Sequence, residues 1–282
     1  TARAHAAGLL ATLGLRKPPR IVVARRVDFP IKGGLAARLK YSDRVDRFVA
    51  VSRAIADVMR AGGIAEDRIR VVHSGVDPER VRVAPDREGL RRELGIPDDA
   101  PVVLFVGALV DHKAPFDLVA ASPALDASTH VVFAGAGPLH ERLHTGAAAA
   151  GWLDRLHFLG HRDDVPRLLR SADVFCLPSR MEGLGTSVLD AMAAGIPVVG
   201  ARAGGIPEMI THGESGLLVP PAEPDVLADT LEQLLQDRAL GARLVEGATR
   251  ALEEFTADRM VEKTLAVYEE VHGGPERAPA DG

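Results

Sequence analysis

The stretch PSRMEGLGTSVLDAMAAG, residues 178–195, places two carboxylates around a glycine turn. Glu182 directly precedes the turn at 183–185, and Asp190 follows in an apolar run that predicts a helix. The glycines allow close approach to a ligand, and the free N–H groups at the helix start, which Thr186 is suited to cap, favour an anion. The pattern predicts a diphosphate site. Glu182 then faces the other end of the ligand, and Asp190 either accepts hydrogen bonds from sugar hydroxyls or only complements the helix dipole.

Two further loops carry residues that could bind a ligand. Lys113 follows the apolar run 101–106 closely enough to reach a phosphate, although a lone lysine there is most often simply solvated. In the loop AGAGPL, Gly135 and Gly137 match the first two positions of a dinucleotide fingerprint, but His140 replaces the third glycine. We interpret this loop as a close-approach turn and not as an NAD site.

Short runs of Val, Ile, Leu and Phe alternate with helix-like segments along the chain. Ser52 has the type and position of an N-cap for a helix that Gly62 and Gly63 close. Continuous apolar strands alternating with helices predict parallel sheets covered on both faces, with ligands bound beyond the carboxyl ends of the strands. The expected strands and their turns lie in residues 20–27, 47–52, 68–77, 101–107, 129–137, 156–160, 173–179, 196–201 and 216–221.

Charge is unevenly distributed along the 282 residues. Lys and Arg number 34 and Asp and Glu 39, so the net charge of −5 argues against bulk nucleic-acid binding. Residues 1–80 nevertheless hold 16 basic and 8 acidic side chains. This surplus fits an anionic partner or a membrane surface, but charge patterning is weak evidence and an ordinary solvated surface is the favoured interpretation.

The cysteine content and hydropathy bear on the compartment. Cys176 is the one cysteine and lies in the apolar run DVFCLP, so we expect an inert buried thiol. A single thiol forms no intramolecular disulfide, which fits a reducing compartment. No apolar run approaches the roughly 20 residues of a spanning helix. We expect a cytoplasmic protein, with peripheral contact at the inner face of the membrane as an open alternative.

Several of these motifs together resemble a known family. Residues 172–221 (ADVFCLPSRMEGLGTSVLDAMAAGIPVVGARAGGIPEMITHGESGLLVPP) resemble the donor-site segment of glycosyltransferase family 4, the retaining nucleotide-sugar-dependent enzymes of the GT-B fold. The similarity extends to VAVSRAIADVM, RIRVVHSGVD and VGALVDHK, so it covers most of residues 45–235. It implies an α/β protein of two Rossmann-like domains, the C-terminal one complete and the N-terminal one partial.

The resemblance assigns roles within residues 178–195. It implies that Glu182 contacts the donor sugar and that Asp190 takes the acidic position that binds the ribose. Asp190 replaces the usual Glu of the family, which shortens the side chain by one methylene. The backbone amides implied to hold the diphosphate are those of Gly183, Leu184, Gly185 and Thr186.

The first two loops also match donor-side positions. Lys113, which follows Gly107, takes the position of a phosphate-binding lysine, and with Glu182 it is the implied catalytic residue. Gly107, Gly135 and Gly137 join the donor-binding set. Ala108 stands where the family usually has Arg, so the phosphate charge would be less well neutralised unless another cation substitutes.

Two more pairs of residues are implied to contact substrates. The loop GHRDDV, residues 160–165, matches the segment near the nucleotide base, with His161 and Arg162 as candidates. Arg25 and Arg26 lie in a stretch on the acceptor side and are candidates for an anionic acceptor, although surface arginines are common there.

The resemblance also implies a domain division. The family's first domain begins with a glycine-rich loop and a histidine near the donor sugar, upstream of a stretch like TARAH, so we expect that ~90 residues of that domain precede Thr1. His5 is not at the position of that histidine. The expected parts are a partial N-terminal acceptor-side domain at 1–85, a linker at 86–100, a nucleotide-sugar domain at 101–255, a helix at 256–272 that packs back on the first domain, and a disordered tail at 273–282.

The implied reaction moves a sugar from a nucleoside diphosphate to an acceptor hydroxyl with retained anomeric configuration. The sequence lacks a D-x-D pattern, so we expect no obligatory Mg²⁺ or Mn²⁺ and no cofactor besides the nucleotide-sugar co-substrate. The acceptor is unknown, lipid-linked or anionic, as in bacterial-type synthesis of cell-envelope glycans or glycolipids. Two alternatives stay open: a sugar-nucleotide epimerase of the same architecture, and a non-catalytic nucleotide-sugar-binding module.

Overall fold

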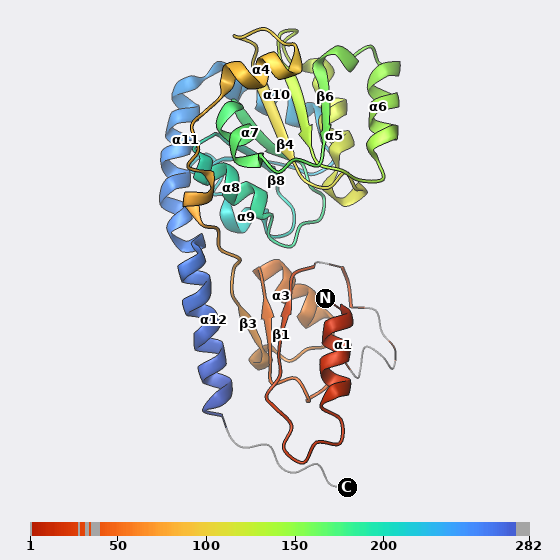
Figure 1. The fold of residues 1–282 in the computed structure, drawn as a ribbon, viewed down its shortest axis with the longest axis vertical. Coiled ribbons are helices and arrows are strands. Elements are labelled where there is room, and N and C mark those ends of the chain that lie inside the picture. Colours follow the sequence, from red (N-terminus) through yellow and green to blue (C-terminus); the bar gives the residue numbers. More distant parts are fainter. Residues whose placement is uncertain (1, 28, 32–33, 35–39, 275–282) are drawn as a thin grey trace. The chain divides into compact units, whose positions relative to one another are not determined.

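The chain folds into two compact units, each with a parallel sheet (Figure 1). The computed structural model describes residues 2–27, 29–31, 34 and 40–274. The small unit comprises Thr1–Ser74 and Asp258–Gly282, and the large unit comprises Gly75–Ala257. Most of the expected tail, residues 275–282, lies outside the described residues. The α/β architecture of parallel sheets expected from the sequence is confirmed.

The large unit is built on a six-stranded parallel sheet with the strand order β6-β5-β4-β7-β8-β9. Because these strands are covered on both faces, they are almost continuously apolar, and Phe105, Phe133 and Phe175 are fully buried in neighbouring strands. The order turns back between β4 and β7, which creates a switch point for ligand binding. The strands are β4 (Val102–Val106), β5 (His130–Ala134), β6 (Leu156–Gly160), β7 (Val174–Leu177), β8 (Val198–Ala201) and β9 (Leu217–Val219).

Helices cover both faces of this sheet (Figure 1). One layer contains α5, α6 and α10, and α5 contacts both of the others. The other layer contains α4, α7, α8 and α11. The helices are α4 (Arg87–Leu94), α5 (Pro115–Ala121), α6 (His140–Ala149), α7 (Val165–Ser171), α8 (Thr186–Ala194), α9 (Ile206–Met209), α10 (Pro224–Gln236) and α11 (Arg238–Ala251).

Residues 86–100, expected to be a linker, include the helix α4 and pack into the large unit. Asp86 caps α4 by accepting the N–H of Gly89 at 3.0 Å. Arg91 is fully buried, donates to the carbonyl of Ala100 at 2.8 Å and pairs with Asp173 at 2.9 Å. One of the charged residues that suggested a linker, Arg91, therefore belongs to an internal ion pair. A buried guanidinium is tolerated there because its donors are satisfied.

The small unit contains a three-stranded parallel sheet in the order β1-β2-β3. As predicted, Ser52 caps a helix: its hydroxyl accepts the N–H of Ile55 at 3.1 Å. The C-terminal helix packs on this sheet, with Val267 buried against Val49 and Val72. The elements are α1 (Ala2–Ala11), β1 (Val22–Arg25), β2 (Arg47–Ala50), α3 (Arg53–Ala61), β3 (Ile69–Val71) and α12 (Ala257–His272).

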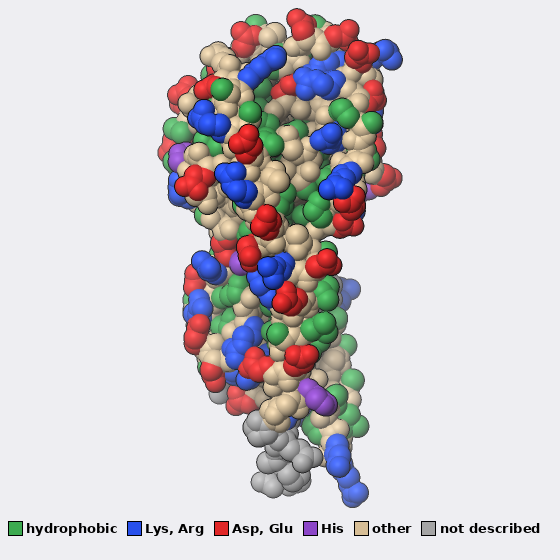
Figure 2. Space-filling model, turned by 90° about the vertical axis from the view of Figure 1, so that its left-hand side faces the viewer, with side chains coloured by type: hydrophobic (Ala, Val, Ile, Leu, Met, Phe, Trp, Pro, Cys, Tyr) green, Lys and Arg blue, Asp and Glu red, His purple; other side chains and the backbone are tan. Residues whose placement is uncertain are grey.

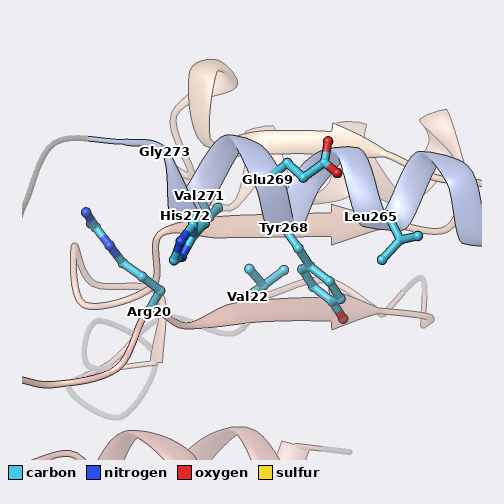
Figure 3. A pocket seen from close by; sticks show the side chains of 8 residues that line it. All are labelled: Arg20, Val22, Leu265, Tyr268, Glu269, Val271, His272 and Gly273. Atoms are coloured by element: carbon cyan, nitrogen blue, oxygen red, sulfur yellow. The ribbon is translucent and has the colours of Figure 1, made fainter.

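The basic surplus of residues 1–80 is partly balanced inside the small unit. Glu270 on α12 pairs with Arg47 at 2.7 Å and with Arg70 at 2.5 Å. Side chains of both signs are mixed over the visible face in Figure 2. A hollow of about 650 Å³ remains between α12 and β1, lined partly by Val22, Leu265 and Tyr268 (Figure 3). Among the described residues, no helix is long and apolar enough to cross a bilayer.

Replacing Asp173 tests the internal ion pair. Besides Arg91, Asp173 accepts the N–H of Val102 at 2.9 Å at the start of β4. Asp173→Ala leaves a buried guanidinium without its counter-charge, so we expect the free energy of unfolding to fall by about 2–4 kcal/mol in urea titrations. Asp229→Ala, an exposed Asp on α10, is the control and should change it by less than about 0.5 kcal/mol. Equal stabilities of the two variants would contradict this account of α4.

A histidine pair predicts how stability depends on pH. His130 Nδ1 lies 3.0 Å from His157 Nε2 across β5 and β6. Burial lowers the pKa of both rings, that of His157 to about 4 from 6.5, with a further contribution from His130. Since the folded-state pKa lies below the unfolded one, the pair's contribution to stability is full above pH 6.5 and is lost as the pH falls towards 4.

We therefore expect the free energy of unfolding to decrease between roughly pH 6.5 and pH 4.5, and to decrease less in His157→Gln. His144→Gln changes an exposed histidine on α6 and should keep the wild-type pH dependence. Chemical unfolding at a series of pH values measures both. The expectation is wrong if His157→Gln follows the wild-type curve.

Candidate active site

Lys113 and Glu182 meet at the switch point of the large sheet. Lys113 ends a short 3₁₀ turn after β4, and Glu182 lies in the loop after the neighbouring strand β7. Their ammonium and carboxylate form an ion pair, with the side chains 18% and 12% exposed. The buried Ser179 donates its hydroxyl to Glu182 Oε2 at 3.3 Å. A cation and an anion thus stand side by side where such sheets bind ligands.

Contacts between the two loops hold this pair in place. The carbonyl of His112 accepts the N–H of Arg180 at 2.9 Å and that of Met181 at 3.3 Å. The Arg180 guanidinium grips Asp117 at the start of α5 through two bonds of 2.6 and 3.2 Å. Because one carboxylate takes two donors of the planar group, the geometry is bidentate and orients the loop. The sequence reasoning missed this clasp, because nothing local links positions 117 and 180.

A second glycine pair supports Glu182 from behind. The N–H of Gly205 donates to the Glu182 carbonyl at 2.9 Å. A Cβ on Gly204, which has a φ of +53°, would lie 2.1 Å from that carbonyl oxygen. No side chain fits there, so the loop after β8 presses its backbone against Glu182. The AGG run after an apolar strand was the signal that could have revealed this contact.

The turn that follows Glu182 opens the helix α8. Gly185 is the N-cap in the left-handed conformation, with a φ of +94°. Thr186 is the first helical residue, so the expected cap by its hydroxyl is wrong. In the described chain, the N–H groups of Gly183, Thr186 and Ser187 make no hydrogen bond. Leu184 is buried and anchors the turn. These amides are available to an anion above the helix start.

Asp190 lies one turn into α8, beside the segment Pro78–Val81. Burial raises the pKa of its carboxyl, and the positive charge of Arg80 partly opposes this. Within the part of the chain that the structure describes, its carboxylate makes no hydrogen bond. A half-buried carboxylate with free lone pairs suits hydroxyl ligands, and its contact with a ribose stays a prediction.

Gly107, Gly135 and Gly137 form the interface between the loops after β4 and β5. The N–H of Gly107 donates to the Ala134 carbonyl at 3.1 Å. A Cβ on Gly135 would lie 1.8 Å from the Gly107 oxygen, and one on Gly137 would lie 2.3 Å from the Leu109 oxygen. The close approach expected of this turn is present. It brings the second loop against the one that carries Lys113.

The ion-pair partners of His161 and Arg162 in the described chain do not include Lys113 or Glu182. Arg162 bonds Asp164 twice at 2.7 Å and Glu93 at 2.6 Å, and this pairing holds the pKa of both carboxyls below their usual values. Its guanidinium is therefore engaged in a structural network. The His161 side chain is 81% exposed. The roles of both at a nucleotide base stay predictions.

Three further predictions concern Ala108, Cys176 and metal binding. Ala108 is exposed and supplies no charge. Cys176 is fully buried in β7, as expected, and burial raises the pKa of its thiol. In the described segments, no group of three or more His, Cys, Asp or Glu side chains could hold a metal ion. Metal-independent chemistry stays a prediction.

The acceptor-side candidates lie in the small unit. Arg25 lines a cavity of about 310 Å³ together with His5 and Lys40. Arg25 Nη1 donates to the Tyr41 hydroxyl at 2.7 Å, while the buried Arg25 Nε and His5 Nε2 have no hydrogen-bond partner among the described residues. Arg26 also lines this cavity, and its guanidinium donates to the Ser74 hydroxyl at 3.1 Å. The cavity therefore offers the unused Nε–H of Arg25 to an anion.

Both units match glycosyltransferase family models. Residues 86–251 match glycosyl transferases group 1, and residues 1–80 match glycosyltransferase family 4. The chain is 36% identical over 247 residues to a D-inositol 3-phosphate glycosyltransferase of Streptomyces bingchenggensis, covering 82% of this chain and 54% of that protein. It is 31% identical over 229 residues to an uncharacterized glycosyltransferase of Methanocaldococcus jannaschii, covering 78% and 59%. The chain thus spans little more than half of these curated relatives.

Solved structures share the fold. Anabaena HepE, in a complex with UDP-glucose, superposes with a TM-score of 0.88 at 23% identity, over 96% of this chain and 77% of that one. WaaG, a glycosyltransferase involved in lipopolysaccharide biosynthesis, gives 0.73 at 20% identity, over 92% and 76%. The family matches and the parallel sheets agree. The chain belongs to the group 1 and family 4 glycosyltransferases of the GT-B fold.

Proposed function

We propose that the protein transfers a sugar from a nucleoside diphosphate sugar to an acceptor hydroxyl with retention of anomeric configuration. The observation that carries the proposal is the Lys113–Glu182 ion pair beside the free amides at the start of α8. This arrangement supplies a cation and oriented dipoles for a diphosphate, and a carboxylate for the hydroxyls of a sugar.

The charges fit the demands of such a transfer. As the bond between the anomeric carbon and the diphosphate breaks, negative charge builds on the leaving group and positive charge on the sugar ring. Lys113 and the α8 amides stabilise the first, and Glu182 orients the sugar and offsets the second. The fixed loops around Glu182 mean that little reorganisation is needed during the reaction.

For the substrates, we propose a UDP-sugar donor and an anionic acceptor. Support for the base comes from HepE, whose structures contain UDP and UDP-glucose. Support for the acceptor comes from the Nε–H of Arg25, which is unpartnered among the described residues, and from relatives named D-inositol 3-phosphate glycosyltransferases. The proposal also includes a lipid-linked acceptor of cell-envelope synthesis, which the protein would reach from the cytoplasmic side of a membrane.

Calorimetric titration with UDP-, GDP- and ADP-sugars, followed by product analysis with D-inositol 3-phosphate, tests the proposal. Binding of one nucleotide sugar and formation of a glycoside with the donor's anomeric configuration are expected. Binding without turnover would favour a nucleotide-sugar-binding module. A folded protein that binds none of the three donors would overturn the proposal.

Glu182→Ala tests the carboxylate assigned to the sugar. We expect transfer to fall by about 100-fold or more, since a preorganised group of this kind contributes most in the transition state. Lys113 loses its counter-charge in this variant, so we expect a lower free energy of unfolding in a protein that still folds. Glu246→Ala, in an exposed position on α11, is the matched control and should keep full activity. Loss of the folded state in Glu182→Ala would give Glu182 a structural role instead.

Arg25→Met tests the acceptor cavity. Loss of a charge-assisted donor should raise the KM for an anionic acceptor roughly 10-fold or more, while the Kd of the donor sugar stays the same. Arg26→Met removes the same charge from a second side chain of the cavity, one that is bonded to Ser74, and should have a smaller effect. Steady-state kinetics with varied acceptor measure both. A wild-type KM in Arg25→Met would count against the cavity.

A further inference from the structure

The two groups assigned to opposite parts of the donor are bonded to each other. Lys113 is the proposed partner of the diphosphate and Glu182 that of the sugar, yet their side chains form one ion pair. A diphosphate that recruits Lys113 therefore competes with Glu182 for the ammonium and weakens the ion pair. Among the described residues, the other partner of the carboxylate is the Ser179 hydroxyl at 3.3 Å, a long and neutral bond.

Glu182 is poorly placed to relax once Lys113 leaves. Its backbone is fixed by the N–H of Gly205 at 2.9 Å and by the close approach of Gly204. Its side chain is 12% exposed, so water restores only part of the lost interaction. An uncompensated carboxylate in such a place is unfavourable, and a neighbouring diphosphate adds like-charge repulsion.

An intact nucleotide sugar compensates for this loss and a free nucleoside diphosphate does not. The sugar brings hydroxyl donors to Glu182, and charge-assisted hydrogen bonds to a carboxylate are stronger than neutral ones. The product of transfer has no such donors and carries one more ionisable oxygen on its terminal phosphate. The two ligands therefore differ at Glu182, although both recruit Lys113.

We infer that the Lys113–Glu182 ion pair makes the protein select the nucleotide sugar over the free nucleoside diphosphate, with Glu182 as the discriminating residue. This inference rests on the proposed function. It assigns Glu182 a role in binding as well as in transfer: its charge penalises the spent nucleotide and favours exchange of product for new donor.

The test compares two ligands in matched variants by calorimetry. Glu182→Gln keeps the size of the side chain and removes the charge that holds Lys113. We expect UDP to bind roughly 3- to 10-fold tighter and UDP-glucose to bind no tighter, so the ratio of their Kd values falls. Glu182→Asp keeps the charge and should not tighten UDP. Asp111→Asn removes an exposed charge near Lys113 and should leave the ratio within about twofold of wild type.

Each outcome decides the inference. The inference is supported if the ratio of the Kd of UDP to that of UDP-glucose falls in Glu182→Gln alone. If the donor panel favours another base, GDP and a GDP-sugar, or ADP and an ADP-sugar, are used as the two ligands. Parallel changes for both ligands, or the same ratio change in Asp111→Asn, overturn the inference and leave the proposed function intact. A wild-type protein that binds none of these ligands overturns both. Should Glu182→Gln fail to fold, tighter UDP binding by Glu182→Asp would still contradict it.

Discussion

Close backbone contacts between neighbouring loops shape the edge of the large sheet at the carboxyl ends of its strands. Gly135 and Gly137 touch the loop after β4, and Gly204 touches Glu182, at distances that leave no room for a Cβ. A side chain is thereby excluded at each of these three positions. The glycines bring the loop after β5 against the loop of Lys113 and the loop after β8 against Glu182, so both members of the ion pair are supported from outside.

The energetic character of the site follows from that arrangement. Both charges are mostly shielded from water, so their interaction is stronger than that of exposed pairs and less screened by salt. The clasp between Arg180 and Asp117 and the shared carbonyl of His112 keep the loops in register without using the pair itself. The chain therefore separates the groups that hold the site together from the groups that are free to meet a ligand.

Local patterns predicted much of this molecule. The alternation of apolar strands and helices, the Ser52 cap and the buried Cys176 follow from neighbouring residues, and the structure agrees. Features set by distant residues were not predictable. Arg91 looked like part of a charged linker, because its partner Asp173 is 82 residues away. The Lys113–Glu182 contact likewise requires β4 and β7 to be neighbours, which no local spacing encodes.

The placement of α12 has a consequence for biosynthesis. Residues after 257 pack on the sheet of the small unit: Val267 lies in its core, and Glu270 pairs with Arg47. Helix α12 can therefore cover the small sheet only after residues 258–272 have left the ribosome, whereas all residues of the large unit have emerged once residue 257 is out. The small sheet is made before the large unit, yet it waits, partly uncovered, until the large unit has been synthesised.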